Sequence, residues 1–193
     1  MNTTRERIID AAASLMLDRG YAGTTVDEIV AGAGVAKGSV YHFFDSKESV
    51  GLAALQAYFE RGKVVVMAGP FDAVEDPVQR ALALVDHVRA VSGQLWEHGC
   101  LAGSFAVELS AVSPAIRAAI AGWFTQFEVW LAGYFQAIAA AASAPDVPTG
   151  TELAAQLLAV IEGGIVMGRA RGDSTRLGAA IDEFRRYLVT LLD

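Results

Sequence analysis

Cysteine, proline and histidine are all scarce in this chain of 193 residues, which has one cysteine, five prolines and three histidines. The single cysteine, Cys100, excludes an internal disulfide and any metal site built from several cysteines, which fits a reducing cytoplasm. Scarce proline and frequent alanine favour helices over a fold of short strands and turns. The first six residues are polar and lack the basic-then-apolar pattern of a signal peptide. We therefore expect an all-α, globular, cytoplasmic protein.

Long uncharged apolar runs are also missing, although 53% of the residues are hydrophobic and the mean hydropathy is +0.37. The nearest candidate for a membrane span is 129–145, but this stretch is rich in small alanines and contains Gln136 and Ser143. A buried or dimer-forming helix explains it better, so we expect no membrane partner. The net charge of −7 excludes a protein coated in positive charge, yet DNA binding needs only a local basic patch.

Apolar residues recur at helical spacing through most of the chain and predict nine helices. Thr25 and Glu28 have the spacing of a capping box, which predicts a helix start, and Gly34 lies in the turn before the next helix. Loops are expected at 71–77 and 144–150. The expected helices cover 5–19, 25–32, 37–44, 46 to beyond 59, 76–97, 102–111, 113–142, 151–171 and 175–192. We divide the chain into two domains, 1–46 and 47–193.

Residues 25–44 have the arrangement of a helix-turn-helix, with a capped helix, a turn at Gly34-Val35-Ala36 and a short second helix. In the second helix Val40 and Phe44 are four residues apart and are expected to face inward, while Phe43 lies nearer the rim. The outward side combines a cation, a glycine that permits close backbone approach and three hydrogen-bonding side chains. These residues are Lys37, Gly38, Ser39, Tyr41 and His42. We predict that this surface enters the major groove of double-stranded DNA.

The first fifty residues resemble the TetR family of transcription regulators in several separate motifs. The motifs are Gly23-Thr24-Thr25-Val26 with Ile29, Gly34-Val35-Ala36-Lys37-Gly38-Ser39-Val40-Tyr41-His42-Phe43-Phe44, and Ser46-Lys47-Glu48. The resemblance implies that Thr25 and Lys47, each at a helix N-terminus, contact phosphates and that the second helix of the motif contacts bases. Phe43 departs from the family pattern, because relatives often carry His or Tyr there to bond a phosphate. Beyond this region only helix order and length agree, as expected where relatives bind different ligands.

The sequence contains no catalytic or cofactor-binding motif with the required residue spacing. The stretch 32–39 matches neither G-x-G-x-x-G nor G-x-x-x-x-G-K-[ST], and no strand is expected before it. His98 lies beside Cys100, but the three histidines are scattered and no two have a helical ligand spacing. No serine lies in a G-x-S-x-G turn. We therefore expect no catalytic residue, no metal site, no cofactor and no enzymatic activity.

Arg5 and Arg7 are expected to be solvated surface arginines, with phosphate contact as the alternative.

Aromatic residues are dense between 123 and 135, more so than the packing of one helix requires. We expect an apolar pocket between helices that binds a small apolar or aromatic effector, with ordinary core packing as the alternative for each residue. His87 and Glu108 are candidate polar anchors. The other expected effector-binding residues are Met67, Leu84, Trp96, Cys100, Phe105, Trp123, Phe127, Trp130 and Met167.

Cys100 allows two interpretations. A thiol at a helix N-terminus can have a lowered pKa, and the stretch 98–101 followed by Glu108 resembles a TetR subset in which some members sense electrophiles through a thiol. Against this, Glu97 opposes thiolate formation, and the chain holds no second cysteine to resolve an oxidised one. Buried cysteine usually packs as a small hydrophobe, and we favour that role.

The last two expected helices, 151–171 and 175–192, carry apolar stripes at helical period. The TetR resemblance implies a homodimer in which this pair forms a four-helix bundle, and Gly163, Gly164 and Gly168 suit a closely packed interface. The chain is thus expected to be a homodimeric repressor that a small effector releases from a palindromic operator. The alternatives are an activator or dual regulator with the same fold, and a helical small-molecule binding protein or enzyme with a vestigial DNA-binding motif.

Overall fold

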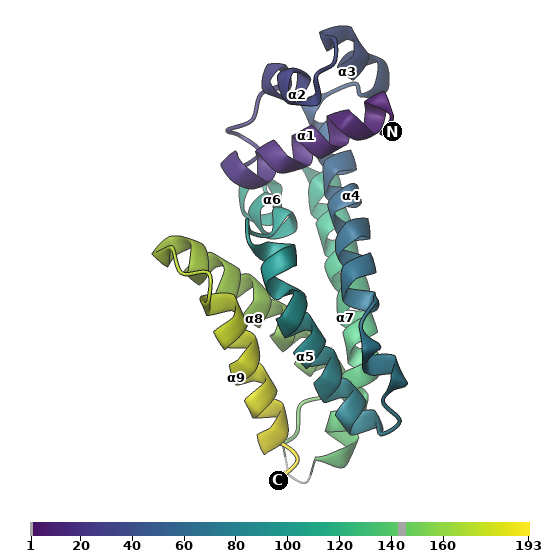
Figure 1. Cartoon of the computed structure of the whole chain (residues 1–193), viewed down its shortest axis with the longest axis vertical. Coiled ribbons are helices and arrows are strands. Elements are labelled where there is room, and N and C mark those ends of the chain that lie inside the picture. Colours follow the sequence, from purple (N-terminus) through teal and green to yellow (C-terminus); the bar gives the residue numbers. More distant parts are fainter. Residues whose placement is uncertain (1, 143–145) are drawn as a thin grey trace. The chain divides into compact units, whose positions relative to one another are not determined.

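A computed structural model of the chain describes residues 2–142 and 146–193. These residues contain nine α-helices, one short 3-10 helix and no strand, which confirms the expected all-α fold (Figure 1). The elements are α1 (Thr4–Arg19), α2 (Val26–Ala33), α3 (Lys37–Phe43), α4 (Lys47–Met67), η1 (Pro70–Ala73), α5 (Pro77–Trp96), α6 (Leu101–Leu109), α7 (Pro114–Ala141), α8 (Gly150–Arg171) and α9 (Arg176–Thr190).

The chain forms two compact units. The first comprises Met1–Gly62 and His98–Gly122, and the second comprises Lys63–Glu97 and Trp123–Asp193. The division falls inside α4 and inside α7, so each of these helices contributes residues to both units. The expected division into a DNA-binding domain, 1–46, and an effector-binding and dimerisation domain, 47–193, stays a prediction.

In the first unit, α1 packs against α2, α3 and α6, and α2 packs against α3. The predicted capping box at α2 is confirmed, because the Thr25 hydroxyl accepts the Glu28 N–H while the Glu28 carboxylate accepts the Thr25 N–H. The helix runs to Ala33, one residue past its expected end, and Gly34 ends it in the left-handed region at φ 60°. Glycine suits this position because it lacks the Cβ that disfavours positive φ.

The core of the first unit confirms the expected division of faces on α3. Val40 and Phe44 are buried, while Phe43 is 40% exposed. Apolar residues from α1, α2, α4, α6 and α7 complete this core: Ile8, Ala12, Met16, Ile29, Val50, Ala54, Leu55, Leu101, Phe105 and Ile116. The outward side chains of α3 are therefore held on a packed base.

In the second unit, α8 and α9 lie side by side and antiparallel, and α5 packs against both α9 and η1 (Figure 1). A Cβ on Gly164 would lie 3.0 Å from the Leu177 Cα, so this glycine permits close packing of α8 against α9 within the chain. Phe184 is buried and its ring contacts Phe135 edge-on at 5.8 Å between centroids. Gly164 and Phe184 thus pack inside the unit and do not lie on its surface.

The connections differ slightly from expectation. The segment expected as a loop at 71–77 contains most of η1, whose Phe71 is buried. Asp76 then caps α5 by accepting the Gln79 N–H. Of the second expected loop, 144–150, residues 144 and 145 lie outside the described residues, and Thr149 caps α8 in a capping box with Glu152.

Helix α8 is long and apolar enough to cross a membrane by length and composition, a test that helices of soluble proteins also pass. The sequence had indicated 129–145 as the nearest candidate for such a span. Only 33% of the most apolar window of α8 is buried inside the chain. The exposed part includes Val166 and Met167, so the helix carries an apolar side that its own unit leaves uncovered.

Candidate nucleic-acid interface and effector site

The residues predicted to contact DNA bases lie on the outward side of α3. Tyr41 is 54% exposed, and the exposed His42 ring packs edge-on against Phe43 at 4.8 Å between centroids. Ser39 is half-buried one turn earlier. A Cβ on Gly38 would meet nothing within 4 Å, so the backbone there is open to close approach. This surface offers hydrogen-bonding groups on a short helix whose opposite side is buried.

Lys37, at the start of α3, forms an ion pair with Asp27 of α2. Its Nζ lies 2.6 Å from Asp27 Oδ1, and both side chains are largely exposed. The hydrogen bond to Asp27 and the charge of that carboxylate raise the pKa of Lys37. The cation is therefore partly neutralised by its own protein when no DNA is bound, a feature that the sequence pattern did not reveal.

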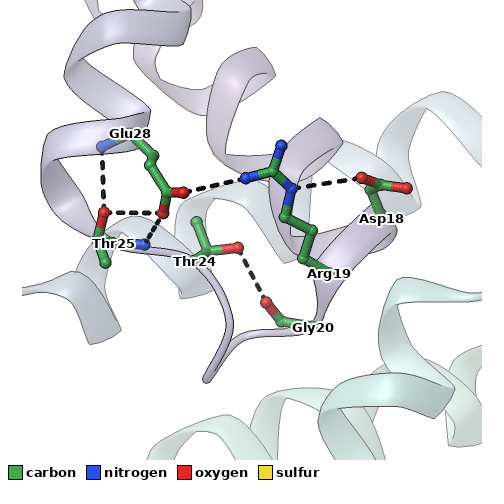
Figure 2. Close-up of polar contacts among 6 residues, drawn as sticks. All are labelled: Asp18, Arg19, Gly20, Thr24, Thr25 and Glu28. Carbon is green, nitrogen blue, oxygen red and sulfur yellow. Dashed lines mark hydrogen bonds and ion pairs between the residues drawn. The ribbon is translucent and has the colours of Figure 1, made fainter.

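Thr25 is fully engaged at the start of α2, as Figure 2 shows. Its hydroxyl donates to Glu28 Oε2 at 2.8 Å and accepts the Glu28 N–H at 3.2 Å. The Thr25 backbone N–H and, after it, the Thr25 hydroxyl lower the pKa of Glu28 by donating to its carboxylate, which keeps that group charged. Arg19 binds the other carboxylate oxygen at 3.0 Å. The hydroxyl of the preceding Thr24 donates to the Gly20 carbonyl. Thr25 is thus a helix cap in this structure, and its phosphate contact stays a prediction.

Lys47, the second predicted phosphate contact, begins α4. Its ammonium lies 4.2 Å from the centroid of the Tyr21 ring, in cation–π geometry. Burial lowers the pKa of Lys47, while the carboxylates of Glu108 and Glu28 oppose that shift. The Tyr21 ring thus holds the Lys47 ammonium at the N-terminus of α4.

Arg7 has a structural role that no local sequence pattern indicates. Its guanidinium donates to the carbonyls of Ala33 and Gly34, at 2.5 and 2.7 Å. These carbonyls end α2 and begin the turn to α3, so Arg7 ties α1 to the centre of the helix-turn-helix. The expectation of a solvated arginine was wrong here, because helix-end carbonyls need donors and no local pattern reveals a partner 26 residues away. Arg5 lies 5.4 Å from the Phe44 ring centroid.

In the second unit, aromatic residues gather around Phe71 of η1. Its ring contacts Trp130 at 6.1 Å and Tyr134 at 5.5 Å between centroids, both edge-on. Trp130 also stacks on Phe127 at 5.8 Å. His87 of α5 lies 5.6 Å from the Phe71 ring on the same measure. We call these five residues the aromatic cluster; it brings together three of the predicted effector-binding residues.

Polar groups border this cluster. The His87 Nε2 lies 3.1 Å from the Val65 carbonyl. The Tyr134 hydroxyl donates to Asp72 at 2.8 Å, and desolvation together with this bond raises the pKa of Tyr134 to about 12. Beside this pair is an open pocket of about 230 Å³ lined by Asp72, Pro77, Arg80, Gly133, Tyr134 and Ala137. None of these six residues was among the predicted effector-binding set.

The other predicted effector-binding residues of the second unit differ in exposure. Leu84 is fully buried in the core, and Trp96 and Trp123 are half-buried. Met67 is 38% and Met167 45% exposed. Their contact with an effector stays a prediction.

Three predicted effector-binding residues belong to α6 and its N-terminus in the first unit. Cys100 is buried and precedes the first residue of α6, and Phe105 is fully buried. The carboxylate of Glu108 accepts hydrogen bonds from the backbone N–H groups of Tyr21 and Ala22. The packing role favoured for Cys100 stays a prediction.

Two family models match the chain. That of bacterial regulatory proteins of the tetR family matches residues 8–54, which include the helix-turn-helix. That of the C-terminal domain of LmrA/YxaF-like transcriptional regulators matches residues 77–183. The chain belongs to the TetR family. This TetR-family protein is a DNA-binding transcription regulator of a non-enzymatic family, as expected.

Individual relatives agree with this assignment. The regulator is 36% identical to the HTH-type transcriptional repressor DhaR of Mycobacterium sp. (strain GP1) over 123 residues, which are 64% of this chain and 61% of DhaR. It is 24% identical to an HTH-type transcriptional regulator in the lacX 3'region of Lactococcus lactis, over 94% of this chain and 91% of that protein. A crystal structure of a TetR regulator from Chloroflexus aurantiacus aligns with a TM-score of 0.82 and 28% identity, over 96% of this chain and 94% of that one. The match to DhaR spans less than two thirds of that protein.

Proposed function

We propose that this regulator is a homodimeric repressor that binds a palindromic operator in the cytoplasm and leaves it when a small apolar or aromatic molecule binds. The observation that carries the proposal is the outward surface of α3. This surface carries the side chains of Ser39, Tyr41 and His42, and Lys37 at the N-terminus of the helix adds a cation. The opposite side of the helix is fixed to the core by the buried side chains of Val40 and Phe44. Hydrogen-bonding side chains on a helix of this kind can distinguish base pairs in a major groove.

The exposed side of α8 supports the homodimer. Small or apolar residues recur along it at helical spacing: Ala155, Ala159, Gly163, Val166 and Met167 are all exposed. Val166 is 62% exposed, and a Cβ on Gly163 would meet nothing within 4 Å. Such a surface is costly to leave in water and fits a second copy of the same helix.

The second unit supports the effector. Tyr134 belongs both to the aromatic cluster and to the 230 Å³ pocket, so a ligand there meets an aromatic wall and a polar pair. This volume is below the roughly 300–1,000 Å³ of drug-sized sites, which favours a small molecule. Repression, as opposed to activation, is favoured by DhaR, which is a repressor.

Selection from a random duplex DNA library tests the proposed function. We expect the regulator to enrich a palindrome with half-sites centred about 10 base pairs, or a multiple of that, apart. Affinity for the enriched duplex should fall steeply with salt, because phosphate contacts release counterions. A library that stays random after repeated rounds would refute operator binding.

The Lys37–Asp27 ion pair leads to a prediction about affinity. Asp27→Asn should free Lys37 for phosphate and remove a negative charge near the DNA, so the enriched duplex should bind about two- to fivefold more tightly, the range of a surface ion pair. Fluorescence anisotropy at moderate salt measures the change.

Asp10→Asn is the matched control, because Asp10 also forms an exposed ion pair, with Arg61 at 2.7 Å. It removes the same charge without touching a predicted DNA contact. Equal gains in both variants would show that net charge, and not release of Lys37, sets the affinity.

A further inference from the structure

The turn between α1 and α2 is bound by the carboxylate of Glu108, near the end of α6. Its Oε1 accepts the Tyr21 N–H at 3.1 Å and its Oε2 accepts the Ala22 N–H at 2.9 Å. All three residues belong to the first unit. Hydrogen bonds from neutral donors to a charged acceptor are among the stronger ones in proteins.

The local backbone is shaped to admit this carboxylate. Gly20 has φ +78°, and a Cβ built on it would lie 2.5 Å from Glu108 Oε1. One turn earlier on α6, the buried Phe105 packs edge-on against the Tyr21 ring at 5.6 Å between centroids. A Cβ on Gly51 of α4 would lie 3.2 Å from the same ring, so that ring is enclosed from two helices. The turn is therefore held by both polar and apolar contacts.

This turn lies next to both predicted phosphate contacts. It leads through buried Thr24 directly to Thr25, the cap of α2. The Lys47 ammonium lies over the Tyr21 ring, and the backbone N–H of Tyr21 donates to the Glu108 carboxylate. A change at Glu108 would thus move the start of α2 and the support beneath Lys47 together.

We propose that Glu108 is a positioning residue for operator binding, a role that rests on the proposed function. Its carboxylate fixes the α1–α2 turn, and through it the start of α2 and the place of Lys47, in the geometry that the DNA backbone requires. Glu108 need not touch DNA to act in this way.

Glu108→Gln tests the role, because it keeps the shape of the side chain but replaces one acceptor oxygen with a donor amide. That amide would face a backbone N–H, so one hydrogen bond is lost and two donors meet. Removing an acidic charge from a protein of net charge −7 should by itself favour DNA, whereas loss of positioning should disfavour it. The two explanations therefore predict opposite signs.

We expect Glu108→Gln to bind the duplex enriched by the wild type about tenfold more weakly, within the range of a lost hydrogen bond to a charged group. Its affinity for random duplex should fall too, because Thr25 and Lys47 are predicted phosphate contacts and such contacts carry sequence-independent binding. Amide hydrogen exchange at Tyr21 and Ala22 should be faster than in the wild type. Glu60→Gln, at an exposed position of α4, is the charge-matched control and should bind as the wild type does or slightly more tightly.

Glu108→Asp provides a second test that keeps the charge. Its carboxylate is one methylene shorter and cannot reach both amides, so operator affinity should again fall. Operator affinities of Glu108→Gln and Glu108→Asp equal to those of Glu60→Gln and the wild type would overturn the positioning role. A fall in affinity accompanied by a weaker helical circular-dichroism signal would overturn it too, since that indicates a general loss of folded protein. A wild type that enriches no duplex would instead refute the proposed function, and the positioning role with it.

Discussion

Val166→Asp should convert the regulator from a dimer to a monomer at micromolar concentration. Val166 is 62% exposed in the chain and lies on the apolar side of α8, so in the proposed dimer it is buried against a second copy. The two-fold symmetry places two new carboxylates in one interface, and each loses solvation without gaining a partner. We expect the dimer dissociation constant to rise at least about 100-fold, equivalent to roughly 2.7 kcal/mol.

Operator binding should fall with dimerisation, because a monomer presents one recognition helix instead of two to a palindromic site. Sedimentation equilibrium measures the first effect and anisotropy with the enriched duplex the second. Val64→Asp is the matched control, since Val64 is a 68% exposed valine on α4 of the same unit. A Val166→Asp protein that stays dimeric, or a wild type that is monomeric, would contradict the proposed α8 interface.

The sequence was sufficient to predict features that depend on local pattern. The Thr25–Glu28 capping box and the inward faces of Val40 and Phe44 follow from spacings of three and four residues, and the structure confirms them. The nine α-helices of the described part of the chain were predicted from apolar periodicity, which every helix that packs on a core must have. Membership of the TetR family followed from motifs confined to the first fifty residues.

Features that depend on partners distant in sequence could not be predicted. Arg7 binds carbonyls 26 and 27 residues away, and the Tyr21 N–H is bound by a carboxylate 87 residues away. The residues next to an arginine or glutamate on an amphipathic helix do not indicate such a partner. Gly164 likewise resembled an interface glycine, but its neighbour is Leu177 of the same chain. Apolar periodicity shows that one face of a helix is covered, but it does not show which other helix covers that face.

Ser39→Ala and His42→Ala should each weaken binding to the enriched duplex and change which bases are preferred. If these side chains contact base edges, each loses about 1–3 kcal/mol of discrimination, or roughly 5- to 150-fold in affinity for the preferred site. Affinity for random duplex should change little, because that binding depends on phosphate contacts. Lys63→Ala, in α4 of the second unit, is a control outside the predicted surface.

The most direct measurement is a repeat of the duplex selection with wild type, Ser39→Ala and His42→Ala in parallel. If α3 reads the operator, the wild type will enrich one palindrome, and each variant will show a relaxed or altered base at a symmetric pair of positions. Identical enriched sequences and equal affinities for all three proteins would contradict the claim that α3 reads the operator.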